Sequence, residues 1–173
     1  DPTNDVCGFD AARKLAILSS IGFRANVTFD DVLVEGIEKI DKSDIQYAKD
    51  MGYTIKLLTV ALRQENGIAL NVYPAFLPDN HPLSSVKGAY NAIYVTGNIV
   101  DDVMFYGRGA GALPTASAVM GDVISTAQHI LNGSTGTGMI MTDTKRIPFY
   151  SSLKLQNSYY FRLDVDDVTG VLS

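Results

Sequence analysis

The sequence predicts an α+β fold in which helices pack on one face of a mostly antiparallel sheet. Two observations support this class. Apolar residues recur at helical spacing near both ends of the chain, and the stretch between them is rich in β-branched residues interrupted by turn signals. With 173 residues, 46% of them hydrophobic, the chain is long enough for one domain with a substantial core.

Three helices are predicted. Residues 8–23 repeat leucine and isoleucine at helical spacing, with alanine between them. A shorter helix is expected to be capped by Ser43 and ended by Gly52. A third begins near Pro114, since proline is favoured in the first turn. Residues 1–7 are polar with an early proline, so we expect a loop there.

The middle of the chain indicates strands joined in hairpins. Asn66-Gly67 is the strongest hairpin signal, because both positions of a tight turn favour φ > 0. It precedes a predicted strand over residues 68–76, in which Pro74 indicates a sheet edge or a bulge. A second hairpin is expected to turn at Gly97-Asn98, and a short strand is expected within residues 32–37.

Charge and composition argue against several classes of function. The net charge is -5 and the pI about 4.8, with no basic run, so nucleic acid and membrane surfaces are not expected partners. One cysteine and two separated histidines do not suggest a metal site. No apolar run approaches the roughly 20 residues of a transmembrane helix. The cysteine count fits a reducing compartment, so we expect a cytoplasmic protein.

Two opposite charges lie on the apolar side of the first predicted helix. On a helical wheel, Asp10 and Lys14 share an arc with Ile17 and Ile21. One interpretation is a surface pair, worth about 0.2–0.5 kcal/mol, whose lysine reaches water past apolar surface. The other is a lysine in a partly desolvated cleft, where its pKa falls toward the working pH and it can exchange a proton. Asp5 could face the same cleft.

Several segments resemble homoserine dehydrogenases. The opening DPTNDVCGFDAARKLAIL is similar to the start of that family's catalytic domain, where D-P-x-x-D…G-x-D-A-x-x-K runs into a helix. The similarity continues through NVYPAFLPDNHPL, VKGAYNAIYVTG and MFYGRGAGALPTASAVMGDVI, and it covers nearly the whole chain. The resemblance implies NAD(P)-dependent interconversion of L-homoserine and L-aspartate 4-semialdehyde, on the route to threonine, isoleucine and methionine.

The resemblance also implies roles for individual residues. Lys14 would be the catalytic lysine, exchanging the proton of the homoserine hydroxyl. Asp10 and Asp5 would bind the substrate, whose ammonium group suits carboxylates. A glycine turn would lie beside the nicotinamide of NADP or NAD, because glycine lets the backbone approach a ligand closely. Its glycines, within GRGAG, are Gly107, Gly109 and Gly111.

The expected organisation is that of a piece of a longer enzyme. Residues 1–132 would form the catalytic and dimerisation domain, with helix 115–132 packing on a nucleotide-binding domain that this sequence lacks. Residues 133–156 would be a linker. Residues 157–173 resemble the first strand and turn of an ACT domain, although Thr169 replaces the family's usual proline. We expect a homodimer through the sheet, and a piece that folds but does not catalyse alone.

Two alternatives stay open. The chain could be a non-catalytic dimerisation or regulatory module, in which Asp10 and Lys14 are only a surface pair. It could also be the substrate domain of a related amino-acid or semialdehyde dehydrogenase, which would not bind homoserine. Replacing Lys14 by alanine in the full-length protein separates the first alternative from catalysis, because turnover should be lost only if Lys14 is catalytic.

Overall fold

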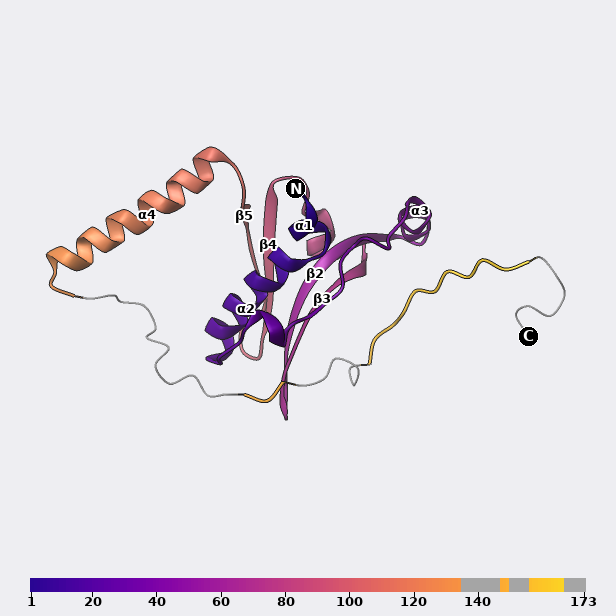
Figure 1. Cartoon of the computed structure of the whole chain (residues 1–173), viewed down its shortest axis with the longest axis horizontal. Coiled ribbons are helices and arrows are strands. Elements are labelled where there is room, and N and C mark those ends of the chain that lie inside the picture. Colours follow the sequence, from indigo (N-terminus) through magenta and orange to yellow (C-terminus); the bar gives the residue numbers. More distant parts are fainter. Residues whose placement is uncertain (135–146, 150–155, 167–173) are drawn as a thin grey trace.

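The computed structural model describes residues 1–134, 147–149 and 156–166. Its described part contains a three-stranded sheet in the order β1-β3-β2 and a two-stranded sheet of β4 and β5 (Figure 1). Because four of the five strands pair antiparallel, the predicted α+β class with a mostly antiparallel sheet is confirmed. In chain order the elements are α1 (Thr3–Val6), α2 (Phe9–Phe23), the 3₁₀ helix η1 (Phe29–Asp31), β1 (Leu33–Val34), α3 (Lys42–Asp50), β2 (Tyr53–Gln64), β3 (Gly67–Pro78), the 3₁₀ helix η2 (Pro82–Ser85), β4 (Tyr90–Gly97), β5 (Asp101–Arg108) and α4 (Ala112–Leu131).

The long hairpin of β2 and β3 is the centre of the fold. It turns through Glu65-Asn66, because Gly67 already pairs with Gln64, so the turn lies one residue earlier than predicted. The strand β1 pairs parallel with β3 at Asn71 and Val72 only. Beyond Val72, toward Pro78, no described strand pairs with that edge of β3. Pro74 lies in this stretch, as its missing N–H requires.

The helix α2 packs closely against this sheet. Gly8, its N-cap, has φ 78°, and a Cβ there would lie 3.1 Å from Val72 Cγ1 and 3.2 Å from Val34 Cγ1. Glycine is therefore favoured at position 8 for two reasons: it adopts the left-handed backbone conformation freely, and it has no Cβ to collide with the valines of the sheet. The buried core is made of alanine, valine, leucine and isoleucine side chains from α2, the segment that follows it and β3. Its members are Ala12, Leu15, Ala16, Ala25, Val27, Val32, Ile68, Leu70 and Val72.

The buried face of α2 is not the face that the wheel predicted. Ile17 is 62% exposed, Leu18 42% and Ile21 47%, and Lys14 shares their side of the helix. Alanines and serines face the sheet together with Leu15, and their small side chains let the helix axis come close to the strands. Weighting the wheel by the largest apolar residues therefore selected the wrong face. The buried residues of α2 are Ala12, Leu15, Ala16, Ser19 and Ser20.

Three local expectations change. The N-terminal stretch forms the helical turn α1 rather than a loop, and Asp1 Oδ1 accepts a hydrogen bond from Thr3 N at 3.0 Å. The N-cap of α3 is Asp41, not Ser43, although Gly52 does follow the helix with φ 78°. The strand expected within residues 32–37 shortens to β1, which has two residues.

The second hairpin and the last helix are confirmed in outline. β4 and β5 pair from Tyr90–Arg108 to Gly97–Asp101, so three residues form the loop near the predicted turn. α4 begins after the N-cap Gly111, contains no buried residue, and extends away from both sheets (Figure 1).

The C-terminal region is described only in part. Residues 156–166 form no strand, although the sequence predicts one, because no described strand pairs with them. The predicted turn of the ACT-like region falls in residues 167–173, outside the described residues. Most of the predicted linker lies outside them as well.

Candidate active site

Asp10 and Lys14 form an ion pair on the outward side of α2. Lys14 Nζ lies 2.7 Å from Asp10 Oδ2, one helical turn away, as their spacing predicts. The side chains are 66% and 44% exposed respectively, so the desolvated cleft expected around Lys14 is not formed by the described residues. The reason is the orientation of α2, which turns its alanine face to the sheet and this pair to the outside.

Asp5 is exposed on α1, immediately before α2. The two helices are joined by a hydrogen bond from Arg13 Nη1 to Asn4 Oδ1, at 3.2 Å. The guanidinium of Arg13 also lies 5.5 Å from the ring centroid of Phe29, which fixes it further. Within the described part of the chain, no hydrogen bond or ion pair connects the Asp5 carboxylate to Asp10.

The junction between α1 and α2 is held by the segment that follows β1. Ile37 N donates a hydrogen bond to Val6 O at 2.9 Å. A Cβ on Gly36 would lie 2.4 Å from Val6 O and 2.7 Å from Cys7 Cα, so no side chain fits there. The Cys7 thiol donates to the Glu38 carboxylate, which raises the pKa of Cys7 and lowers the pKa of Glu38. We call these contacts between residues 6–7 and residues 36–38 the clamp. The sequence did not predict it, because it joins residues about 30 positions apart and has no local pattern.

The predicted glycine turn runs from the end of β5, which contains Gly107, to Gly111, the N-cap of α4. Gly109 N donates to Ala89 O at 3.1 Å, and a Cβ on Gly109 would overlap the amide of Asn91. Gly111 has φ 123°, a conformation that favours glycine. Gly107 has nothing within 4 Å of the position of a Cβ, so its surroundings are open. The three glycines therefore have different local surroundings within one exposed turn.

The surroundings of this turn include a helix N-terminus and an arginine. The backbone N–H groups at the start of α4 form the positive end of a 20-residue helix, where an anionic group is favoured. Beside it, the Arg108 guanidinium lies 4.9 Å from the ring centroid of Tyr90, which stacks on Tyr106 at 4.9 Å. No hydrogen bond or ion pair among the described residues joins the turn to Asp10 or Lys14.

Residues 1–134, 147–149 and 156–166 contain neither a metal-binding cluster nor a membrane-spanning helix. No cluster of three histidine, cysteine, aspartate or glutamate side chains there could hold a metal ion. No helix in the same part of the chain has the length and hydropathy to cross a membrane.

Comparison with known proteins identifies the family. The family model described as homoserine dehydrogenase matches residues 1–124. The chain belongs to the homoserine dehydrogenase family. It is 42% identical over 173 residues to the homoserine dehydrogenase of Bacillus subtilis, and 43% identical over 178 residues to that of Corynebacterium glutamicum. Each alignment covers 100% of this chain and 40% of the relative, so the chain spans about two fifths of the length of these homoserine dehydrogenases.

Solved homoserine dehydrogenases share the fold. The enzyme from Thiobacillus denitrificans superposes with a TM-score of 0.80 at 38% identity, covering 87% of this chain and 36% of that one. A hyperthermophilic archaeal homoserine dehydrogenase in complex with NADPH gives a TM-score of 0.56 at 27% identity, covering 74% and 35%. The predicted family is therefore confirmed, whereas the roles of Lys14, Asp10 and Asp5, the glycine turn and the domain boundaries stay predictions.

Proposed function

We propose that this chain is the substrate-binding and catalytic part of an NADP- or NAD-dependent homoserine dehydrogenase. The reaction would interconvert L-homoserine and L-aspartate 4-semialdehyde in the synthesis of threonine, methionine and isoleucine. The observation that carries the proposal is the Asp10–Lys14 ion pair, held on the α2 helix inside the region matched by the family model. Because the chain spans 40% of its relatives, the activity is proposed for the full-length protein.

Lys14 would act as the acid–base group, and Asp5 and Asp10 would bind the substrate. Oxidation of the homoserine alcohol removes a hydride from carbon and a proton from the hydroxyl oxygen. NADP or NAD, when bound, supplies the hydride acceptor. Neutral Lys14 takes the hydroxyl proton on Nζ, and in the reverse direction its ammonium returns that proton to the aldehyde oxygen. Asp10 orients Nζ at 2.7 Å and stabilises the ammonium form, while Asp5 and Asp10 attract the substrate ammonium.

This role requires that Lys14 lose contact with water. The apolar residues beside it, Ile17, Leu18 and Ile21, are exposed, and such a stripe favours a covering layer. We propose that the nucleotide-binding domain of the longer protein covers this stripe and α4, which also lacks any buried residue. Burial would then exclude water from the Lys14 amine, so that it exchanges its proton with the substrate rather than with solvent.

The glycine turn would hold the cofactor. Gly107 offers an open approach, and the N-terminus of α4 offers backbone N–H groups. The choice between NADP and NAD would rest with residues of the nucleotide-binding domain proposed above.

The two-stranded sheet supports a homodimer. A hairpin of two strands is marginally stable by itself, and both outer edges of β4 and β5 lack a described partner strand. Apolar side chains on this sheet are also exposed. They are Ile93, Val95, Met104, Phe105 and Tyr106. We propose that a second copy of the chain covers them, which sedimentation equilibrium of the protein would test.

The decisive experiment replaces Lys14 in the full-length protein. We expect Lys14→Ala to lower kcat with homoserine and NADP by about 10²–10⁴-fold, the usual contribution of a positioned acid–base group. The oligomer should stay intact. Lys49→Ala, which replaces an exposed lysine of α3, is the matched control and should retain full turnover.

One observation favours the non-catalytic alternative. Lys14 is 66% exposed, as in an ordinary surface pair. If Lys14→Ala leaves kcat unchanged, that alternative holds and the catalytic role fails. If the intact protein oxidises a different amino alcohol but not homoserine, the related dehydrogenase is correct.

A further inference from the structure

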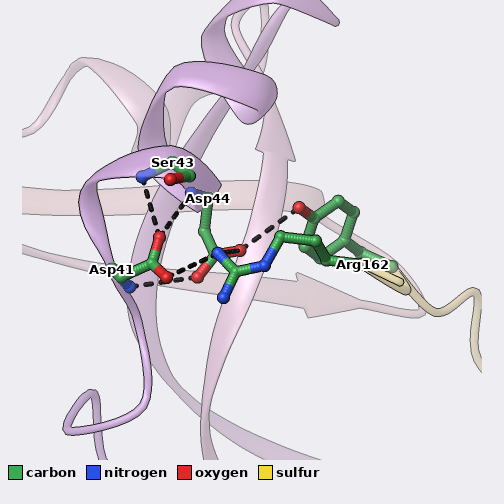
Figure 2. A network of polar contacts seen from close by, with 5 residues as sticks. Asp41, Ser43, Asp44 and Arg162 are labelled. Atoms are coloured by element: carbon green, nitrogen blue, oxygen red, sulfur yellow. Dashed lines mark hydrogen bonds and ion pairs between the residues drawn. The ribbon is translucent and has the colours of Figure 1, made fainter. Parts of the chain in front are cut away.

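The start of α3 leaves one free oxygen on each of two carboxylates. Asp41 Oδ1 accepts hydrogen bonds from Ser43 N at 2.8 Å and from Asp44 N at 3.1 Å (Figure 2). In return, Asp44 Oδ2 accepts from Asp41 N at 3.0 Å. This reciprocal cap satisfies the helix end and uses one oxygen of each aspartate. Asp41 Oδ2 and Asp44 Oδ1 take no part in it.

Arg162 binds these two remaining oxygens. Its Nη1 atom lies 2.6 Å from Asp41 Oδ2 and 2.7 Å from Asp44 Oδ1 (Figure 2). One cationic nitrogen thereby offsets the repulsion between two adjacent negative charges. The Asp44 side chain is only 9% exposed, and a carboxylate so buried is costly unless donors surround it.

Tyr160 provides a second, partly apolar contact. Its hydroxyl donates to Asp44 Oδ1 at 3.2 Å, and its ring stacks on Phe76 of β3, with centroids 4.6 Å apart. Tyr160 and Arg162 are two residues apart, the spacing that places side chains on one side of an extended segment. The residue between them, Phe161, is 78% exposed, so the inward side is the one that carries the contacts.

We propose that Asp41 and Asp44 form a socket for Arg162, and that this ion pair and the Tyr160–Phe76 stack latch residues 156–166 onto the α3 end of the β2–β3 hairpin. The socket has two uses, because the same carboxylates cap α3 and bind the C-terminal segment. The latch positions the beginning of the predicted ACT-like region against the domain. It is independent of the chemistry proposed for Lys14.

The test measures how fast chymotrypsin cleaves the 173-residue chain after Phe161, by mass spectrometry under native conditions. Phe161 is exposed, but the contacts of Tyr160 and Arg162 on either side of it hold the backbone against the domain. A protease must extend this backbone in its active site, so the cleavage rate should follow the population in which these contacts are broken. Arg162→Gln should raise this rate about three- to tenfold, between the effects of an exposed and a buried ion pair. It should also remove the nuclear Overhauser effects between the rings of Tyr160 and Phe76.

Two further variants sharpen the test. Arg162→Lys should keep most of the protection, because a single nitrogen contacts both carboxylates and an ammonium can replace it. Arg63→Gln removes an exposed arginine from β2 and should leave the rate unchanged.

Two results would overturn the latch. One is an unchanged cleavage rate with unchanged ring contacts in Arg162→Gln. The other is an equal acceleration in Arg63→Gln, which would indicate a general effect of charge. Because Arg162 lies outside the buried core, the thermal unfolding of the α2–sheet core should be the same in all variants. If Arg162→Gln nevertheless unfolds the core, Tyr160→Ala replaces it, and unchanged cleavage after Phe161 in that variant counts against the latch.

Discussion

Ile37 N donates a hydrogen bond to Val6 O at 2.9 Å, across the junction where α1 meets α2. At the same junction, the interaction of Cys7 with Glu38 raises the pKa of Cys7 and lowers the pKa of Glu38. The segment after β1 therefore restrains the start of α2, from which Asp10 projects, and the α1 turn that carries Asp5. The fold supports the candidate site through this clamp, although neither Cys7 nor Glu38 belongs to the proposed chemistry.

The clamp predicts a pH window. The hydrogen bond between Cys7 and Glu38 lowers the pKa of Glu38 below 4.5. Its contribution to stability is therefore present above pH 4.5 and is lost as the pH falls through the lowered pKa. The same bond raises the pKa of Cys7 above 9.0, so its contribution is present below pH 9.0 and is lost as the pH rises through the raised pKa.

The reactivity of Cys7 tests this contact. We expect Glu38→Gln to speed alkylation of Cys7 by iodoacetamide at mildly alkaline pH, because more thiolate forms. Glu65→Gln, in the β2–β3 turn, should not; equal rates for both variants and the unchanged chain would contradict the contact.

Gly36 is expected to be the most sensitive point of this clamp. Gly36→Ala places a Cβ 2.4 Å from Val6 O and 2.7 Å from Cys7 Cα, both backbone atoms that cannot swing away. We expect a loss of about 1–3 kcal/mol in the free energy of unfolding in urea, as for other overpacked sites. Gly22→Ala in α2, where nothing lies within 4 Å, should be neutral or stabilising. Similar losses for both variants would show that the clamp is looser in solution.

Local patterns predicted the elements better than their contacts. Helical spacing found α2 and α4, and turn residues found both hairpins, because these signals lie within a few neighbouring positions. The buried face of α2 was not predicted, because a hydropathy pattern places an apolar residue such as Ile17 inside and a polar residue such as Ser20 outside. In the structure Ile17 is exposed and Ser20 is buried. Ser20 is buried because its hydroxyl bonds to both the N–H and the C=O of Val27, a partner on a later loop.

The candidate site shows the same division. The Asp10–Lys14 pair follows from their four-residue spacing, which the structure confirms as an ion pair. The contact between Asp44 and Arg162 spans 118 residues, so no local pattern could reveal it. The exposure of Lys14 was equally hidden, because it depends on which side of α2 meets the sheet.

The N-terminus of α3 gives a third prediction. Asp41→Ala removes the side chain that accepts from two backbone N–H groups, so we expect a loss of about 0.5–2 kcal/mol in the free energy of unfolding. Ser43→Ala should cost much less, because the Ser43 side chain does not cap the helix. Urea unfolding followed by far-ultraviolet circular dichroism measures both. A larger cost for Ser43→Ala would restore Ser43 as the cap.

The glycine turn gives a prediction for the full-length protein. A Cβ at Gly107 meets nothing within 4 Å, so Gly107→Ala should leave the melting temperature unchanged. If the dinucleotide approaches this backbone, the added methyl group should raise the KM for NADP while the affinity for homoserine stays the same. Gly97→Ala, in the β4–β5 hairpin, is the control and should leave the KM unchanged. An unchanged KM in Gly107→Ala would place the cofactor elsewhere.

The orientation of α2 can be tested directly, because substitutions on its buried side should destabilise the fold and substitutions on its exposed side should not. Ala12 is 0% exposed against the sheet, so Ala12→Leu forces three extra carbon atoms into a filled space and should cost about 1–3 kcal/mol of unfolding free energy. Ile17 is 62% exposed, so Ile17→Ser in the 173-residue chain should change that free energy by about 0.5 kcal/mol or less. In the full-length protein the cost of Ile17→Ser should rise if another domain covers this stripe. If Ile17→Ser is instead the costly change in the short chain, α2 buries the side that carries Lys14, and the cleft first expected around that lysine exists without any covering domain.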